Sequence, residues 1–207
     1  MELLLIRHGL PIRRELTEGI ADPELAPDGL AQAALLGRYL ESEHLDAVYA
    51  SSLRRAQQTA GPVVAGRDLE LQIEPDVAEF DKDSPEYVPV EELKANNDPR
   101  WQAMLDGTME GMEDHEVFAS RSIAGVDRII DAHRGQRVAV VCHGGVINAY
   151  LSHILQLDQG QRGFFYPNYT SIHRVAAASS GERSVVTVNE TSHLRGSGLP
   201  MGLFQKG

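Results

Sequence analysis

The sequence is poor in cysteine and has no long apolar run. Cys142 is the only cysteine among 207 residues, which excludes an internal disulfide bond and is consistent with a reducing compartment. No stretch approaches the roughly 18 consecutive apolar residues that a membrane-spanning helix needs. The apolar run at residues 3–6 is too short for the core of a signal peptide and lacks a cleavage region. We therefore expect a cytoplasmic protein without a membrane partner.

Basic residues are scarce as well. Lys and Arg total 19 against 30 Asp and Glu, so the formal net charge is −11. Binding to nucleic acid depends on a basic face that neutralises phosphates, and this composition argues against it. A few arginines that converge in one pocket can still reverse the local field. A small anionic substrate is therefore compatible with the charge, whereas nucleic acid is not an expected partner.

The pattern of apolar residues predicts strands that alternate with helices. Continuous apolar runs at residues 3–6 and 137–142 are typical of buried strands in a parallel sheet. Further strands are predicted at 46–50 and, more exposed, at 69–73. Amphipathic spacing predicts helices at 27–43, 51–66, 117–133 and 146–155; the second would be capped by Ser51 or Ser52. We expect one α/β domain over residues 1–207, a three-layer sandwich whose mostly parallel central sheet is flanked by helices.

Two regions depart from this alternation. Residues 79–116 are rich in acids, contain three prolines and show weak apolar periodicity. We interpret them as a partly helical excursion over the active-site end of the sheet; disorder is the competing interpretation, which Trp101 and its apolar neighbours disfavour. Residues 170–178 and 184–188 predict a strand pair on the edge of the sheet. An exposed edge strand could support a homodimer.

Two histidine-containing segments follow buried strands. Arg7-His8-Gly9 ends the first apolar run, and His143-Gly144-Gly145 ends the run at 137–142. In open α/β sheets, ligands bind in the crevice outside the carboxyl ends of the strands. Arg55 follows the strand predicted at 46–50 and starts from the same edge. We expect these imidazole and guanidinium groups to meet at one place.

These residue types suit phosphoryl transfer without a metal. A neutral imidazole is a nucleophile, which makes His8 the candidate for attack on phosphorus. Arg7 and Arg55 offer planar, bidentate donors that match phosphate geometry. His143 can donate a further hydrogen bond, and Gly144 leaves a backbone N–H open near the start of a helix. Together they predict a site that holds a phosphate in front of His8.

The leaving alkoxide or phenoxide also needs a proton. Glu79, at the start of the excursion, is the candidate general acid if burial keeps it protonated. Glu74, Asp76 and Asp81 lie close by in sequence and are rival candidates. The choice among these acids depends on their surroundings in the folded chain.

These motifs resemble those of the histidine phosphatase superfamily, which includes cofactor-dependent phosphoglycerate mutases and many phosphatases. The family's Arg-His-Gly signature is matched by Arg7-His8-Gly9. Its Ser-x-Leu-x-Arg-Ala-x-x-Thr-Ala segment is matched at residues 51–60. Its second histidine motif is matched by His143-Gly144, and the acid before the excursion by Glu79. The matches occur in the family's order between residues 5 and 147.

The resemblance implies a fold, a mechanism and a set of site residues. The fold would be the α/β sandwich described above, and the chemistry would require neither a metal nor a cofactor. The nucleophile that becomes phosphorylated would be His8, and the proton donor would be Glu79. The phosphate pocket would be formed by Arg7, Arg55 and His143.

Some positions depart from the family pattern or stay open. Cys142 stands where Ser or Thr is common, and we expect a small buried residue there. Arg54 is interpreted as a solvent-exposed helix residue. Arg13 and Arg14 fit either exposed loop charges or contacts to an anionic substrate. Trp101 and the apolar residues near it are interpreted as packing of the excursion rather than as a substrate wall.

Three functions follow from this pattern, and the leading one is a phosphatase that releases phosphate from a small monoester. The alternative within the family is a phosphoglycerate mutase, which would need more basic residues over the site. The excursion offers only Lys82, Lys94 and Arg100 against many acids, which favours the phosphatase. A binding domain without catalysis is the third reading, but such a domain has no need of a nucleophile.

Overall fold

A six-stranded sheet forms the centre of the computed structural model, which describes residues 1–106, 108–109, 111–157 and 163–202. The strands follow the order β4-β3-β6-β1-β7-β8. Four of them (β1, β3, β4 and β6) run parallel, whereas β7 and β8 are antiparallel to their neighbours. Their bounds are Glu2–Arg7 (β1), Ala47–Ala50 (β3), Leu71–Ile73 (β4), Arg137–Cys142 (β6), Ile172–Ala177 (β7) and Arg183–Glu190 (β8).

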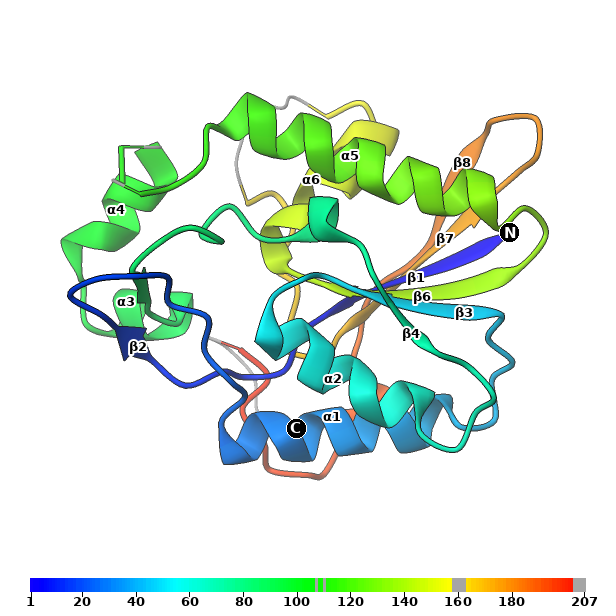
Figure 1. Ribbon diagram of the computed structural model, residues 1–207, viewed down its shortest axis with the longest axis horizontal. Coiled ribbons are helices and arrows are strands. Elements are labelled where there is room, and N and C mark those ends of the chain that lie inside the picture. The colour runs from blue at the N-terminus through cyan, green and yellow to red at the C-terminus, as the bar shows by residue number, and fades with distance from the viewer. Residues whose placement is uncertain (107, 110, 158–162, 203–207) are drawn as a thin grey trace.

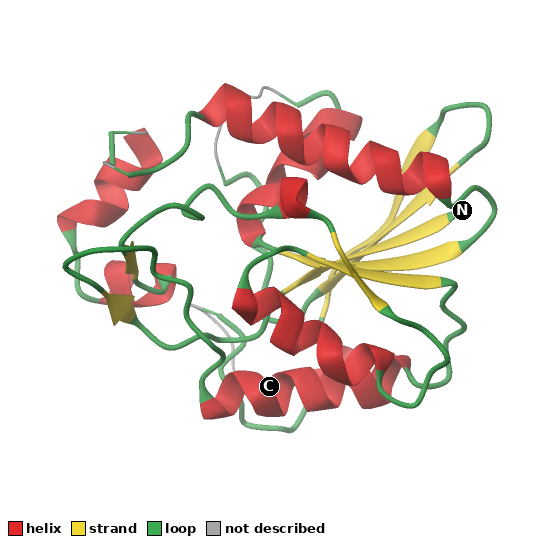
Figure 2. Cartoon of the chain, viewed as in Figure 1, coloured by secondary structure: helices red, strands yellow, loops and turns green. Residues whose placement is uncertain are grey.

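Two pairs of helices cover the two faces of this sheet (Figures 1 and 2). One face carries α1 (Pro27–Leu40) and α2 (Arg54–Val64), and the other carries α5 (His115–Ala132) and α6 (Gly144–Ile154). The predicted three-layer α/β sandwich with a mostly parallel sheet is confirmed.

The continuous apolar run of β1 is explained by burial on both faces. Leu3 and Leu5 pack in the cluster formed with α5 and α6, whereas Leu4 and Ile6 pack in the cluster formed with α1 and α2. All four side chains are 0% exposed, and each contributes roughly 1.5–3 kcal/mol through burial. This packing fixes the strand whose carboxyl end delivers Arg7.

The excursion lies at the carboxyl ends of the parallel strands (Figure 1). It contains β5 (Glu86–Tyr87), α3 (Val90–Ala95) and α4 (Pro99–Asp106), so the prediction of a partly helical segment is confirmed. β5 pairs with β2 (Arg14–Glu15) in a small antiparallel sheet. That sheet was not predicted, because two-residue strands are too short to show a periodicity.

The predicted strand pair at the sheet edge is confirmed, whereas one helix end and one helix cap differ from the prediction. β7 and β8 form the expected pair at the sheet edge, and the residues of β4 are half-buried or exposed. Helix α1 ends at Leu40, three residues earlier than predicted. Helix α2 is capped by Leu53 rather than by a serine, and no side chain caps it. The 3₁₀ turns η1 (Pro75–Val77) and η2 (Ser192–Leu194) complete the elements. Among the residues described, no helix has the length and hydropathy required to cross a bilayer.

Candidate active site

Four neighbouring parallel strands deliver the predicted side chains to one edge. Arg7 is the last residue of β1 and His8 follows it; His143 follows β6 directly. Arg55 lies in the first turn of α2, after β3, and Glu79 comes after β4 and η1. The structure therefore brings these five residues together, and each is at most 8% exposed.

One ring nitrogen of His8 faces the backbone of the next residue. The Nδ1 of His8 lies 2.7 Å from the carbonyl oxygen of Gly9. A carbonyl can only accept, so Nδ1 carries the hydrogen and Nε2 keeps its lone pair. Burial, followed by the charges of Arg55 and Arg7, holds the pKa of His8 well below its ordinary value of 6.5. The imidazole is therefore neutral, as a nucleophile must be.

His143 faces His8 across the site. The centroids of the two rings are 5.0 Å apart. His143 Nε2 lies 2.7 Å from the hydroxyl of Ser51, which also accepts the backbone N–H of Leu53. Ser51 therefore positions His143 instead of capping α2. Burial and the charge of Arg55 lower the pKa of His143 well below 6.5, so the ring is neutral. Because its Nε2 accepts the hydroxyl hydrogen of Ser51, the ring hydrogen is on Nδ1, on the opposite side of the ring.

The guanidinium of Arg7 is fixed on its outer side. Its Nη1 donates to the carbonyl of Pro167 at 2.7 Å and to Oε1 of Glu91 at 3.3 Å. Its Cζ lies 4.1 Å from the ring centroid of Tyr169. The hydroxyl of Tyr169 donates to Oε2 of Glu91 at 2.6 Å. Burial alone would raise the pKa of Glu91, but Arg7 and the tyrosine hydroxyls hold it below its usual value, so it is a carboxylate that orients Arg7.

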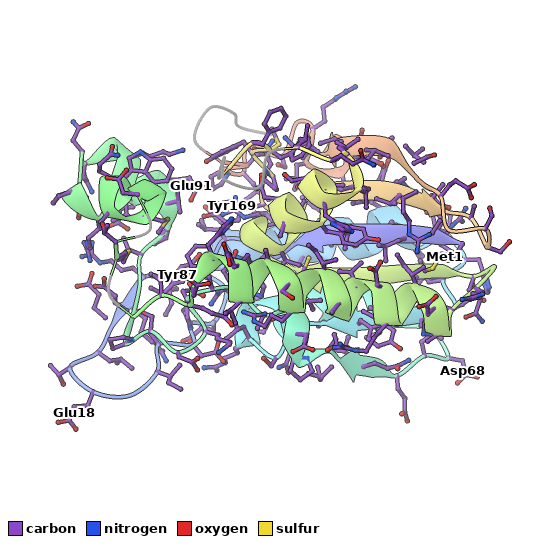
Figure 3. All side chains as sticks on the ribbon, turned by 90° about the horizontal axis from the view of Figure 1, so that it is seen from above. Met1, Glu18, Asp68, Tyr87, Glu91 and Tyr169 are labelled. Atoms are coloured by element: carbon purple, nitrogen blue, oxygen red, sulfur yellow. The ribbon has the colours of Figure 1, made fainter. Side chains whose placement is uncertain are left out.

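Arg55 is held in a similar way by the excursion. Its Nη2 donates to Oδ1 of Asp81 at 2.8 Å, and its Cζ lies 4.6 Å from the ring centroid of Tyr87. Figure 3 shows Tyr87, Glu91 and Tyr169 where the excursion meets the body of the chain, with Met1 at the opposite end. Each arginine therefore has a carboxylate and an aromatic ring on its outer side.

The inner sides of these groups carry donors without partners. Among the described residues, four such buried nitrogens belong to the site: Arg7 Nε, Arg55 Nε, Arg55 Nη1 and His143 Nδ1. Buried donors are nearly always hydrogen-bonded in folded proteins, and an unpaired one costs about 1–3 kcal/mol. Four from three residues around one imidazole match a tetrahedral oxyanion with several acceptor oxygens. The arrangement can hold a phosphate in front of His8.

Glu79 is buried beside this site and is bound by the start of α6. Its Oε2 accepts the backbone N–H of Gly145 at 2.8 Å. A β-carbon on residue 145 would overlap Oε1 of Glu79, so only glycine permits this approach. Burial, and then the charge of Asp81, raises the pKa of Glu79 to about 7. The carboxyl group can therefore carry a proton near neutral pH, as a general acid requires.

The rival acids have other partners. Glu74 and Asp76 form ion pairs with the exposed Arg128, and Asp81 pairs with Arg55. Glu79 is thus the acid of this group whose surroundings favour a bound proton, although its role stays a prediction.

The remaining sequence predictions have mixed outcomes. Arg54 is 53% exposed and pairs with Glu24, which confirms that it is solvated. Arg13 pairs with Glu15 and Glu92, and Arg14 pairs with Glu24; the choice between loop charge and substrate contact stays open. Cys142 is fully buried, as expected. Gly144 is the first residue of α6 and lines the cleft; its contact to phosphate stays a prediction.

Sequence reasoning missed the residues that orient the site. Asp81 was considered only as a rival acid, and Gly145 was not assigned a role. Glu91, Tyr87 and Tyr169 gave no signal, because each lies in a short or irregular segment and reaches the arginines through tertiary packing.

The site opens into a cleft of about 630 Å³. The excursion, the start of α5, helix α6 and residues 163–167 line it. Trp101 and Met104 lie on its wall; the ring of Trp101 also contacts Lys94 within the excursion, and its interpretation as packing stays a prediction. Within the described ranges, no three His, Cys, Asp or Glu side chains come together as ligands for a metal ion.

Known proteins resemble this chain over most of its length. Phosphoserine phosphatase 1 of Hydrogenobacter thermophilus is 26% identical over 205 residues, which cover 94% of each protein. The metal-independent phosphoserine phosphatase of Arabidopsis thaliana is 30% identical over 164 residues, or 75% of this chain and 69% of that protein. The solved structure of YhfR from Bacillus stearothermophilus superimposes with a TM-score of 0.74 at 24% identity, covers 93% and 98% of the two chains, and shows the same fold.

A family model supplies the assignment that these likenesses suggest. The model described as the histidine phosphatase superfamily, branch 1, matches residues 3–191. That range includes both histidine segments, the arginine segment at 51–60 and the whole excursion. The chain belongs to the histidine phosphatase superfamily.

Proposed function

We propose that the protein is a phosphomonoester hydrolase that works through a phosphohistidine on His8 and needs no metal. The observation that carries this proposal is the ring of four unpartnered buried donors around a neutral imidazole. Family membership supports it, as do relatives named phosphatases, one of them named as metal-independent. The substrate is a small phosphorylated molecule, and the reaction takes place in the cytoplasm.

The first half-reaction transfers the phosphoryl group to the enzyme. The lone pair on Nε2 of His8 forms a bond to phosphorus as the bond from phosphorus to the leaving oxygen breaks. Arg7, Arg55 and His143 hold the three remaining oxygens and stabilise the charge that they carry in the transition state. Glu79 gives its proton to the leaving oxygen, and the alcohol departs.

The second half-reaction returns the enzyme to its starting state. A water oxygen attacks phosphorus and the bond to Nε2 of His8 breaks. Glu79, now a carboxylate, takes a proton from that water. Inorganic phosphate leaves, and both His8 and Glu79 regain their initial protonation.

The surroundings of the site support a phosphatase over a mutase. A mutase must retain a doubly phosphorylated intermediate, which calls for several free cations over the site. Lys82 pairs with Asp83, and Arg100 pairs with Asp98. Within the described excursion, Lys94 is the one lysine or arginine that forms no ion pair, although the charge of Glu91 acts on it.

Phosphate release from 4-nitrophenyl phosphate tests the proposal. We expect turnover that EDTA leaves unchanged and that His8→Ala abolishes. Turnover retained in His8→Ala would remove the nucleophile, and loss of activity in EDTA would indicate metal-assisted hydrolysis. With 3-phosphoglycerate and bisphosphoglycerate, we expect free phosphate as the main product; 2-phosphoglycerate would identify a mutase instead.

A further inference from the structure

The cleft extends well beyond the space that a phosphate needs. Its volume of about 630 Å³ lies within the range of roughly 300–1,000 Å³ that is typical of pockets for drug-sized ligands. Most of its surface away from the arginines is apolar. The large apolar residues that line it are Phe80, Val88, Val90, Leu93, Trp101, Met104, Met109, Met112, Phe118 and Phe165.

Six of these residues lie outside the core clusters and are only half-buried: Val88, Val90, Trp101, Met104, Met109 and Met112. Trp101, Met104, Met109 and Met112 are here called the apolar wall. Large apolar side chains gathered on an accessible concave surface are typical of ligand sites. Methionine suits such a surface, because its flexible thioether adapts to differently shaped apolar groups.

The acids in the cleft already have partners. Glu86 accepts from Arg100 at 2.9 Å, and Glu113 forms an ion pair with Arg121. Asp114 accepts the first backbone N–H groups of α5. Asp81 and Glu91 hold the two phosphate-binding arginines, as described above. In the described part of the cleft, four carboxylates are therefore neutralised by arginines, which disfavours the ammonium group of an amino-acid ester such as phosphoserine; they are Asp81, Glu86, Glu91 and Glu113.

Lys94 is a cation that lines the cleft beside the apolar wall. The ammonium of Lys94 lies 4.1 Å from the ring centroid of Trp101 and 4.9 Å from that of Tyr166. Both distances are within the range at which an aromatic face attracts a cation. A small acidic leaving group such as glycerate would bind Lys94 but leave most of the apolar wall uncovered.

We propose that the apolar wall is a leaving-group subsite, which makes the preferred substrates phosphomonoesters of large alkyl or aryl alcohols. The inference rests on the proposed phosphatase function and adds the chemical class of the alcohol. The main support for this inference is that the arginines, His8 and the apolar wall line the same cleft. An alcohol released from a phosphate in front of His8 leaves through the cleft that this surface lines.

A series of unbranched alkyl phosphates separates binding from chemistry. Ethyl, butyl and hexyl phosphate have leaving groups of nearly equal basicity, so differences in kcat/KM report contacts of the chain. A fully buried methylene is worth about 0.8 kcal/mol and a half-buried one about half of that, or roughly twofold per methylene. We expect kcat/KM to rise about 16-fold from ethyl to hexyl phosphate, and phosphoserine to be a poorer substrate than hexyl phosphate.

Substitutions in the wall test the assignment to these residues. Met104→Ser and Trp101→Ala should each reduce the ratio of hexyl to ethyl kcat/KM several-fold, and two variants guard against loss of folding in one. Val186→Ser, at an exposed position of β8 outside the cleft, should leave that ratio unchanged. Equal kcat/KM for all three esters, or a preference for phosphoserine or 3-phosphoglycerate, would overturn the subsite while the phosphatase stands. Failure to hydrolyse even 4-nitrophenyl phosphate would instead refute the proposed function.

Discussion

Replacing Glu79 by Gln removes the proposed acid and keeps the shape of the side chain. Gln can still accept the N–H of Gly145, which Glu79 accepts at 2.8 Å, so the position of residue 79 should be preserved. Without a proton donor, alkyl phosphates should lose about 10²–10⁴ in kcat, since general acids contribute rate factors of that order; this equals about 3–5 kcal/mol of barrier. Nitrophenolate leaves without a proton, so 4-nitrophenyl phosphate should slow far less.

The pH profile gives the same prediction a second measurement. Burial, then Asp81, raises the pKa of Glu79 to about 7. The protonated acid is present below that value, so kcat for alkyl esters should be level below about pH 7 and fall tenfold per unit above it. The low pKa of His8 keeps its imidazole neutral over this range. In Glu79→Gln the descending limb should disappear.

The raised pKa of Glu79 also has a consequence for stability. Glu79 binds its proton more tightly in the folded state, because its pKa there is about 7 against an ordinary value of 4.5. The stability that this proton confers is complete below 4.5 and is lost as the pH rises through about 7, a loss of about 3 kcal/mol. In urea unfolding, the free energy of unfolding of Glu79→Gln relative to that of the wild type should therefore increase by about 3 kcal/mol between pH 4.5 and 8.

A control on the excursion separates acid chemistry from general damage. Glu92 lies next to Glu91 on α3 but pairs with Arg13 on the outer side. Glu92→Gln should leave both the leaving-group dependence and the pH profile unchanged. The reasoning about Glu79 is refuted if its Gln variant slows alkyl and aryl phosphates equally and keeps the descending limb.

Substitutions at three further positions test how the site is held in place. Gly145→Ala should displace Glu79, because the added methyl overlaps its carboxylate, and alkyl phosphates should slow at least tenfold more than aryl phosphates in steady-state assays. Arg55→Lys loses two inner donors, and kcat should fall by about 10²–10³, with weaker inhibition by inorganic phosphate. Glu91→Ala frees the guanidinium of Arg7, so KM should rise several-fold, whereas Glu91→Gln keeps the contacts and should restore a KM near the wild-type value. Equal KM values in the two variants would count against a positioning role.

Much of the site could be predicted because its residues follow strands directly. The apolar runs ending at Arg7 and Cys142 indicate buried parallel strands, and the carboxyl ends of such strands share one edge. His8 and His143 could therefore be placed together without coordinates. The order of the motifs along the chain then indicated the family.

The parts that were missed depend on contacts between distant segments. Ser51 looks like a helix cap by its position, but its hydroxyl is directed to His143 and Leu53 takes the capping place. Glu91, on a six-residue helix, orients Arg7, and no local pattern distinguishes it from its neighbour Glu92, which is also half-buried. Trp101 was interpreted as packing, and an isolated aromatic residue gives no local sign that it also borders a cleft.

The central claim is that phosphate is transferred to the imidazole of His8. The enzyme is mixed with 4-nitrophenyl phosphate and the reaction is quenched rapidly without acid. Peptide mapping under alkaline conditions then identifies the phosphorylated residue. The account predicts one acid-labile phosphate on Nε2 of His8 that appears before steady-state turnover and is absent in His8→Ala. Turnover at full rate with no phosphate on the protein, or with phosphate on another residue, would contradict it.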